Sequence, residues 1–320
     1  MFRHEALLYD GAAGFLSGTV PFIREGLRAE EPVLVAVRKD KIRLLAHALG
    51  PDAGAVRFVD MAALGRNPAR IIPAWEAFVA EHGSATGVRG IGEPISLGHR
   101  GAELVECQLH ESLLNAAFAD AQGFSLICPY DVAALTPEVV HEARCSHPLI
   151  ADAGGDCVAS EHYRGVGGVD GPAASPLAPP RSRPEVLSFQ LEELVEVRRL
   201  VARRAAASGL GAIETDQLVL AANELASNSV RHGGGFGVLR VWDEDEAVVC
   251  EVRDRGQIDD RLVGRRAPRL DQMGGWGLWI VNQTCDLVEV RSGSAGTVVR
   301  ARMRAAGRAG SSYNQEETYE

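Results

Sequence analysis

The 320-residue chain lacks the features that would place it in a membrane or outside the cell. No window holds 18 continuous apolar residues, so no segment is predicted to span a bilayer. The N-terminus has no long apolar run of the kind found in signal peptides. Six cysteines are scattered without a C-x-x-C pair, a pattern typical of reduced thiols. We therefore expect a cytoplasmic protein with no membrane partner.

Positively charged residues are outnumbered by negatively charged ones. Asp and Glu number 43 against 33 Lys and Arg, and the net charge is −10. This balance argues against nucleic-acid binding as the main function, so no direct nucleic-acid partner is expected. The chain is long enough for two ordinary domains, and its 46% hydrophobic content is typical of globular proteins.

The first half alternates short apolar runs with segments of helical periodicity. Strands are expected over residues 5–9, 32–37, 56–60 and 124–128, and helices over 14–30, 40–49, 68–82 and 102–119. This alternation predicts right-handed crossovers and a mostly parallel sheet. Residues 1–152 are thus predicted to form an α/β domain.

This half resembles the MEDS sensory domain of methanogen and methylotroph regulators. The resemblance is carried by the stretches HEALLYDGAAGFLSGTVPFIREGL, EEPVLVAV, GRNPARIIPAWEAF, ECQLHESLLNAAF and CPYD. It implies a RecA/KaiC-like fold without a phosphate-binding loop. The sequence agrees, because DGAAGFLSGT after the first strand has no G-K-[ST]. The domain would then sense a small molecule or serve as a docking platform.

Polar residues in this half are candidates for contacting such a ligand. We single out His4, Glu93, Cys107 and His110, against the alternative that they are ordinary capping and helix-surface residues. His141, Cys145 and His147 lie close in sequence but lack a fourth metal ligand nearby. For these three the favoured interpretation is a loop with incidental polar residues.

A change in composition separates the two halves. Residues 153–184 are rich in Gly, Pro, Ala and Ser and are predicted to be a linker. Residues 185–306 read as a short strand, an amphipathic helix over 192–208, and a second helix that starts near Thr215 and stops at Gly233. Strands follow over 237–242, 247–253, 287–291 and 297–304. This order predicts an α+β two-layer sandwich, and residues 307–320 are expected to be disordered.

The second helix contains NELASNSVRHG, in which Glu224 and Asn228 stand four residues apart. This spacing places a carboxylate and a carboxamide on one helical stripe, beside the apolar face. Such a pair suits an acid–base group next to a ligand for a hard cation. An isolated E-x-x-x-N is more often a solvated helix edge, so the downstream sequence must decide between the two interpretations. Three segments occur there in order: VRDRG, MGGWGL and AGTVV.

These four segments resemble the N, G1, G2 and G3 boxes of the GHKL (Bergerat-fold) ATPases. NELASNSVRHG is most similar to the anti-sigma-factor and serine-kinase branch. The resemblance implies that ATP and Mg²⁺ bind, that Asn228 coordinates Mg²⁺ through its amide oxygen, and that Glu224 is the general base. Asp254 would accept a hydrogen bond from the adenine amino group. The remaining nucleotide contacts would come from Gly256, Gly274, Gly275, Gly277, Leu278 and Thr297.

The sequence departs from the family pattern in three places. DRGQI has no second glycine two residues after Gly256, and Trp276 stands where the G2 box often has a smaller or polar residue. The lid, residues 259–272, carries four arginines that could meet phosphates, an acidic partner or water. They are Arg261, Arg265, Arg266 and Arg269.

The resemblance leads to a functional hypothesis. We expect an ATP-binding anti-sigma regulatory protein that sequesters a sigma factor and phosphorylates Ser or Thr on an anti-anti-sigma (STAS-type) partner, under control of the N-terminal sensor. One alternative is a non-catalytic ATP-binding module that acts by sequestration alone. Another is a histidine kinase with His110 as acceptor, which is disfavoured because no two-helix hairpin precedes residue 185. A homodimer is left open.

Overall fold

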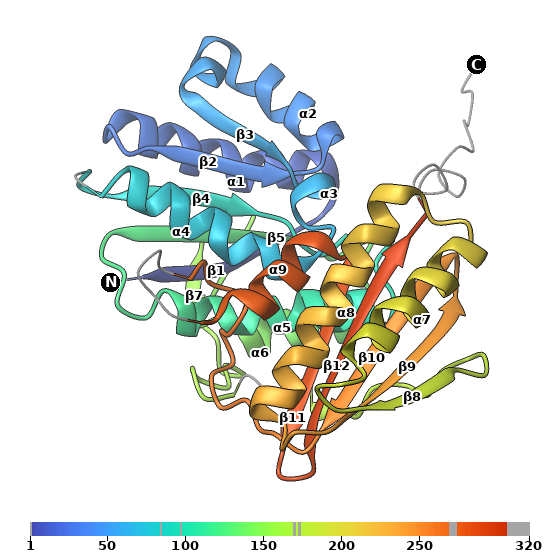
Figure 1. Cartoon of the computed structure of the whole chain (residues 1–320). Coiled ribbons are helices and arrows are strands. Elements are labelled where there is room, and N and C mark those ends of the chain that lie inside the picture. Colours follow the sequence, from blue (N-terminus) through green and yellow to red (C-terminus); the bar gives the residue numbers. More distant parts are fainter. Residues whose placement is uncertain are drawn as a thin grey trace. The chain divides into compact units, whose positions relative to one another are not determined.

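The computed structural model describes residues 2–83, 85–96, 98–168, 171, 174–268 and 274–305. The chain divides into two compact units, residues 1–175 and 176–320, and each unit has its own sheet (Figure 1). Among the described residues, none of the helices combines the length and apolarity needed to cross a bilayer. The predicted tail, residues 307–320, lies outside the described part of the chain.

A seven-stranded sheet forms the N-terminal unit. Its strands are β1 (Arg3–Tyr9), β2 (Val33–Val37), β3 (Val56–Asp60), β4 (Val88–Gly92), β5 (Phe124–Asp131), β6 (Leu149–Asp152) and β7 (Cys157–Ala159). They lie in the order β3-β2-β4-β5-β1-β6-β7. Every neighbouring pair is parallel except β6 and β7. The predicted mostly parallel α/β fold is thus confirmed.

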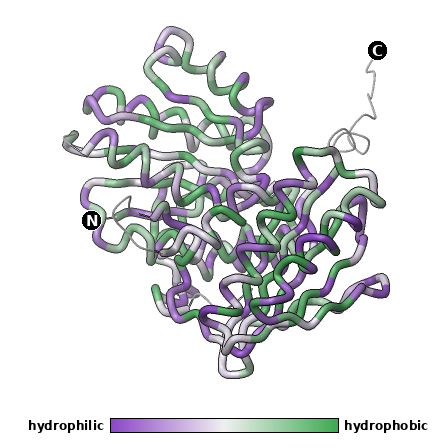
Figure 2. Tube along the Cα trace, viewed as in Figure 1, coloured by the Kyte–Doolittle hydropathy of each residue, from purple (hydrophilic) through white to green (hydrophobic). Residues whose placement is uncertain are grey.

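Helices connect these strands and cover the sheet. They are α1 (Gly11–Arg28), α2 (Lys39–Leu49), α3 (Met61–Leu64), α4 (Ile71–Glu81), α5 (Gly101–Ala117) and α6 (Pro137–Ser146), with 3₁₀ turns η1 (Gly50–Ala55) and η2 (Pro68–Arg70). All five residues of β2 are buried, as expected for a strand covered on both faces. Figure 2 shows this strand region as mostly hydrophobic, whereas the helices alternate between hydrophobic and hydrophilic residues.

Several elements of this unit were not predicted. Strand β4, with the sequence VRGIG, was not predicted because glycine is uncommon in strands. Its glycines make room for Trp75: a β-carbon at Gly90 would lie 2.9 Å from the Trp75 ring and 2.8 Å from Leu126. The loop expected around His141 and Cys145 is wrong, because both lie on helix α6. Residues 153–184, expected as a linker, include β7, which pairs with β6.

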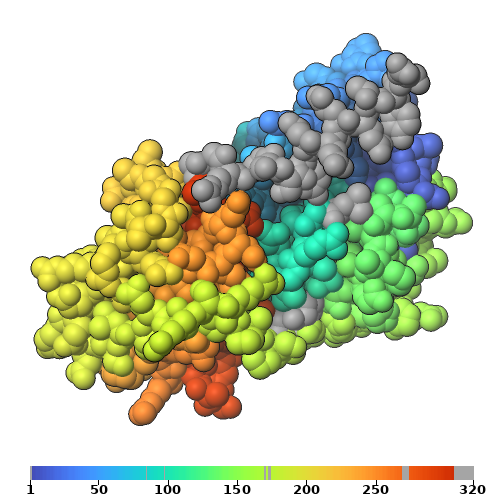
Figure 3. All heavy atoms as spheres, turned by 90° about the vertical axis from the view of Figure 1, so that its right-hand side faces the viewer, coloured from blue at the N-terminus to red at the C-terminus, as the bar shows by residue number. Residues whose placement is uncertain are grey.

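The C-terminal unit has helices on one face of an antiparallel sheet, as predicted. Its elements are β8 (Glu185–Phe189), α7 (Leu194–Ala207), α8 (Ala212–His232), β9 (Gly237–Glu244), β10 (Ala247–Asp254), α9 (Trp276–Thr284), β11 (Leu287–Gly293) and β12 (Gly296–Arg304). The strand order is β11-β12-β10-β9-β8, and all neighbours are antiparallel. In Figure 3 the atoms of α7 and α8 are coloured yellow, and those of β8 are lime.

The core of this unit lies between the helices and the sheet. Leu218 and Leu225 of α8 and Val281 of α9 are buried against apolar residues of β9, β10 and β12. Helix α8 begins at Ala212 with Gly211 as its N-cap, so the prediction that Thr215 caps it is wrong. The helix ends at His232, next to Gly233, as predicted.

The opposite face of the sheet carries buried charges. Glu251 of β10 is fully buried and accepts hydrogen bonds from Arg240, Arg253 and Arg300. Arg300 also lies over the ring of Trp242. Burial alone would raise the pKa of Glu251, but the bonds from Arg253 and Arg300 outweigh it and lower the pKa below its ordinary value.

Candidate functional site

Helix α8 places Glu224 and Asn228 at the edge of the helical layer. Leu218 and Leu225 anchor the helix in the core, whereas Glu224 and Asn228 are only half-buried. Because the two polar residues are four apart, they lie one turn apart on the same side of the helix. The packing of α8 therefore fixes the position of both side chains without hiding them from solvent.

The first turn of α9 meets these two side chains at Gly277. A β-carbon at Gly277 would lie 2.9 Å from Asn228 Nδ2, 3.3 Å from Asn228 Oδ1 and 3.0 Å from Glu224 Oε2. A side chain at position 277 would therefore require the ends of Asn228 and Glu224 to move. Gly275 caps the helix with φ of 83°, a left-handed conformation that glycine adopts at low cost.

The approach of α9 has an electrostatic consequence. The first backbone N–H groups of a helix have no partner within the helix, and its N-terminus carries a partial positive charge. This end of α9 lies against Glu224 and Asn228 through Gly277. Such a helix end favours anions such as phosphate groups. An amide oxygen, a carboxylate and the N-terminus of a helix therefore share one place in the fold.

A second group of predicted residues gathers at the end of β10. The Asp254 carboxylate accepts a hydrogen bond from the Gly256 N–H at 2.8 Å and another from the Ser229 hydroxyl at 2.5 Å. A β-carbon at Gly256 would lie 2.7 Å from the His232 carbonyl oxygen and 3.0 Å from Gly233 Cα. The G1 glycine is thus required by the close packing of two chain segments.

Thr297 closes this second group from β12. It is buried, and its hydroxyl donates to the Gly256 carbonyl at 2.8 Å. Ser292 Oγ lies 2.7 Å from Thr297 Oγ1 and accepts a bond from the Ile258 N–H, also at 2.7 Å. Sequence reasoning missed Ser229 and Ser292. Of the two, Ser229 could have been found from the sequence, because it follows Asn228 directly within NELASNSVRHG.

The predicted sites therefore form two groups linked by α8. Glu224, Asn228 and Gly277 meet at the start of α9, and Asp254, Gly256 and Thr297 meet at the end of β10. Ser229 connects them, because it is the neighbour of Asn228 and donates to Asp254. Among the other predicted contacts, Leu278 is buried in the core, whereas Gly274 and Gly275 are exposed.

The lid is described as far as residue 268, so Arg269 lies outside the described residues. Gly264 packs on α9, where its carbonyl accepts a hydrogen bond from the Asn282 amide at 2.9 Å. Arg265 is buried with a 6% exposed side chain, whereas Arg261 and Arg266 are exposed. Of these three arginines, only Arg261 and Arg266 present surfaces to solvent.

The candidate ligand residues of the N-terminal unit do not meet at one site. All four are buried, with exposures of 0% for His4, 5% for Glu93, 1% for Cys107 and 0% for His110, so the helix-surface interpretation is wrong. Glu93 forms an ion pair with Lys41. Burial raises the pKa of Glu93, and the nearby Lys41 opposes this shift. His4 belongs to a separate buried cluster of polar side chains.

Comparisons with known proteins identify both units. Residues 3–148 match the family model of the methanogen/methylotroph, DcmR sensory domain (MEDS), and residues 187–303 match that of the histidine kinase-like ATPase domain. No curated protein matches the chain. Among solved structures, it is similar to the RsbU and RsbW domains of Rv1364c from Mycobacterium tuberculosis. That likeness has 21% identity and a TM-score of 0.30, and covers 40% of this chain and 33% of the other.

The chain thus spans about a third of the solved chain that it matches. The two family models together account for most of the described residues and agree with the two folds. The protein therefore joins an N-terminal MEDS sensory domain to a C-terminal histidine kinase-like ATPase domain.

Proposed function

We propose that the C-terminal domain binds ATP with Mg²⁺ at the junction of α8 and α9. Asn228 would hold Mg²⁺ through its amide oxygen, in keeping with the oxygen ligands that this ion prefers. The α9 N-terminus would hold phosphate oxygens through its free N–H groups. The observation that carries the proposal is the close approach of Gly277 to both Asn228 and Glu224, which leaves no room for a side chain between them.

The adenine end of the nucleotide would lie against Asp254. This carboxylate is held by the Gly256 N–H and the Ser229 hydroxyl, and its remaining lone pairs can accept a bond from an exocyclic amino group. Thr297 supports the same corner by bonding to the Gly256 carbonyl. A pre-oriented acceptor of this kind favours adenine, which has an amino group at this edge, over guanine, which has a carbonyl oxygen there.

We further propose that the domain transfers the terminal phosphoryl group to a Ser or Thr hydroxyl of a protein partner. Glu224 would accept the proton of the attacking hydroxyl and Asn228 would stay one helical turn away, which separates the base from the cation ligand. Bound Mg²⁺ would supply neutralisation of phosphate charge. Resemblance of NELASNSVRHG to anti-sigma kinases makes an anti-anti-sigma protein of STAS type the proposed substrate and a sigma factor the sequestered partner.

Isosteric variants test this assignment. The E224Q variant keeps the shape of the side chain but cannot take a proton, so we expect ATP to bind normally and transfer to fall by about 10²–10⁴-fold. The N228A variant should lose Mg²⁺-dependent ATP binding. D216N, an exposed change on the same helix, is the matched control and should leave both unchanged. The measurements are ATP binding by calorimetry and the mass of a STAS-domain partner after incubation with Mg·ATP.

A non-catalytic ATP-binding module is the second candidate. The absence of a second glycine two residues after Gly256 favours this candidate. Gln257 and Ile258 allow the backbone of this segment fewer conformations than glycine would, so the adenine pocket has a different shape from that of the family pattern. In that case the wild-type protein would bind ATP but leave the partner mass unchanged. If the wild-type protein and the E224Q variant transfer the phosphoryl group equally well, Glu224 is not the base. That result would leave the proposal of ATP binding intact.

A histidine kinase using His110 receives no support from the fold. His110 lies within α5 with no exposed surface, so a phosphoryl donor cannot reach its ring nitrogens. Incubation with labelled ATP should therefore leave no acid-labile label on the protein.

A further inference from the structure

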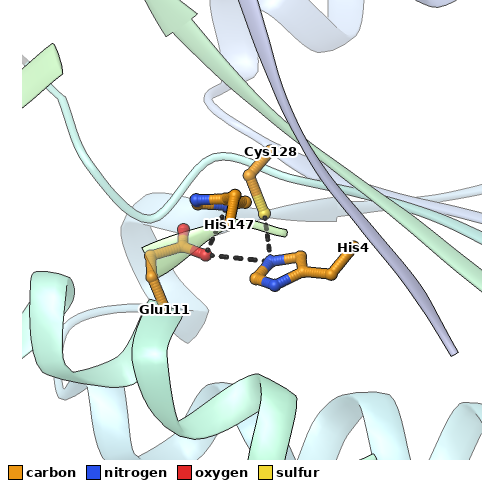
Figure 4. Close-up of side chains that lie close together, drawn as sticks. All are labelled: His4, Glu111, Cys128 and His147. Atoms are coloured by element: carbon orange, nitrogen blue, oxygen red, sulfur yellow. Dashed lines mark hydrogen bonds and ion pairs between the residues drawn. The ribbon is translucent and has the colours of Figure 1, made fainter. Parts of the chain in front are cut away.

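Four side chains that can bind a metal ion meet inside the N-terminal unit: His4, Glu111, Cys128 and His147 (Figure 4). One nitrogen, oxygen or sulfur atom from each lies within 4.8 Å of the others. The exposed fractions are 0% for His4, Glu111 and His147 and 1% for Cys128. This cluster lies in the MEDS domain and has no part in the function proposed for the ATPase domain.

Four different elements bring these residues together. His4 is on β1 and Cys128 on the neighbouring parallel strand β5, where Cys128 pairs with Ala6. Because side chains alternate along a strand, His4, Ala6 and Cys128 lie on one face of the sheet. Glu111 comes from α5, and His147 is the residue that follows α6.

Three of the distances between ligand atoms are those expected in a tetrahedral metal site. The Nε2 atoms of His4 and His147 each lie 3.3 Å from Glu111 Oε2, and Cys128 Sγ lies 3.4 Å from His4 Nε2. Tetrahedral zinc, with bonds of about 2.0–2.2 Å to N or O and about 2.3 Å to S, places neighbouring ligand atoms about 3.3–3.6 Å apart. These three pairs are thus spaced as ligands around one ion, and all four atoms lie within 4.8 Å of one another.

Hydrogen bonds around the cluster orient both imidazoles toward this point. His147 Nδ1 lies 2.8 Å from the Ala143 carbonyl, which can only accept, so Nδ1 carries the proton. His4 Nδ1 lies 3.0 Å from Asn115 Oδ1. The Asn115 amide orientation is set by its Nδ2, which donates to the Ser146 carbonyl at 2.7 Å, so His4 Nδ1 is also the protonated nitrogen. Metal-binding histidines are held in this way by a carbonyl or amide partner.

Both Nε2 atoms therefore present lone pairs to the Glu111 carboxylate. Glu111 Oε1 and Oε2 and His147 Nε2 have no hydrogen-bond partner among the residues that the structure describes. A proton on one Nε2 atom would give a hydrogen bond to Glu111 from that imidazole only. Protons on both Nε2 atoms would bury two positive charges beside one carboxylate, which leaves a net positive charge. A divalent cation between them would bind both Nε2 lone pairs and Glu111 Oε2, and with two neutral imidazoles, a carboxylate and a thiolate the site is electrically neutral.

We propose that these four residues bind one zinc ion, or a divalent ion of similar preference, as a closed structural site of the sensory domain. The mixed nitrogen, sulfur and oxygen donors suit Zn²⁺ rather than Mg²⁺ or Ca²⁺, which prefer oxygen alone. Four protein ligands leave no open coordination position, which is typical of a structural site. The ion would tie β1, β5, α5 and the end of α6 to one another.

A cysteine nucleophile is the weaker interpretation of the same residues. Cys128, His4 and Asn115 are arranged as a thiol, an imidazole and an amide, as in some hydrolases. However, the thiol is 1% exposed and the Glu111 carboxylate lies next to the same imidazole nitrogen. A substrate has no access to the sulfur, so a metal ligand is the role that burial allows.

Metal content of the full chain tests the proposal. Protein purified with zinc present and then dialysed should hold one zinc per chain by atomic emission. C128A should hold none, whereas C145A, which removes another buried cysteine, should still hold one. Cobalt in place of zinc should give the visible bands of a tetrahedral ion and a thiolate charge-transfer band that C128A removes.

Two further measurements keep the outcome clear where C128A does not fold. A strong chelator should lower the Tm of the wild-type protein, and zinc should restore it. N115L should fold but weaken zinc affinity about 10–100-fold, because it removes the partner that orients His4. The proposal is overturned if the dialysed wild-type chain holds no stoichiometric zinc, or if C128A and C145A retain it equally.

Discussion

Replacing Gly277 by alanine is the sharpest test of how the C-terminal site is built. The added β-carbon would lie 2.9 Å from Asn228 Nδ2, shorter by about 0.5 Å than the 3.4 Å at which ordinary contact begins, and 3.0 Å from Glu224 Oε2. Both side chains must therefore move by several tenths of an ångström. Because a 1 Å misplacement at a reacting centre can cost about 100-fold, we expect phosphoryl transfer and Mg·ATP affinity to fall by about 10-fold or more.

The same substitution should not unfold the domain. Gly277 lies in the first turn of α9 and does not have a positive φ, so alanine fits the backbone. Alanine favours helix over glycine by at most about 1 kcal/mol, which offsets part of the steric strain. The free energy of unfolding should thus change little, and any loss of binding would be local.

The assay compares G277A with G293A, a control in the same domain. A β-carbon at Gly293 meets no heavy atom within 4 Å, and this glycine also lacks a positive φ. Calorimetry gives the Mg·ATP affinity, and denaturant unfolding gives the stability. If G277A is as stable as G293A and binds Mg·ATP equally well, the close approach of α9 to Asn228 and Glu224 has no role in binding, and the proposed site is wrong.

Other perturbations test neighbouring parts of the same domain. S229A removes the hydroxyl that donates to Asp254 at 2.5 Å, so the preference for ATP over GTP should fall by about 5–100-fold in competition binding. L218A creates a cavity in the core and should lower the free energy of unfolding by about 2–5 kcal/mol, whereas L220A, at a side chain that is 43% exposed, should change it by less than about 1 kcal/mol. Because the arginines lower the folded-state pKa of Glu251, its contribution to stability is present above the unfolded pKa near 4.5 and is lost as the pH falls below it. E251Q should destabilise the protein by about 3 kcal/mol at pH 7 in urea unfolding, and the gap to wild type should narrow at pH 4; an unchanged gap would contradict this account.

Local patterns in the sequence were sufficient to predict the fold class of the C-terminal domain. The helical period that contains Glu224 and Asn228 and the apolar runs of β9 to β12 are each visible within a few residues. Their order along the chain then indicated the two-layer fold. Prediction failed where a capping residue had to be chosen, because Thr215 and Gly211 both suit a helix start and only the packing of α8 selects between them.

Weak local signals explain what the sequence left out of the N-terminal domain. Strand β4 has two glycines that contact Trp75 from a different element, so nothing within VRGIG marks it as a buried strand. Strand β6 has only four residues, too few to show a clear pattern in the sequence. It is a strand because it pairs in parallel with β1.

The amino-acid sequence by itself determined the two-domain order and the class of each fold, because these depend on periodicity and short spacings. The residues of the ATPase motifs were assigned from their resemblance to a known family. Only the tertiary structure decided which distant side chains meet. His4 and Cys128 are 124 residues apart and share a face only because β1 and β5 pair in parallel. His147, which lies near His141 and Cys145 in sequence, joins His4 and Glu111 instead, because the end of α6 directs it into the core.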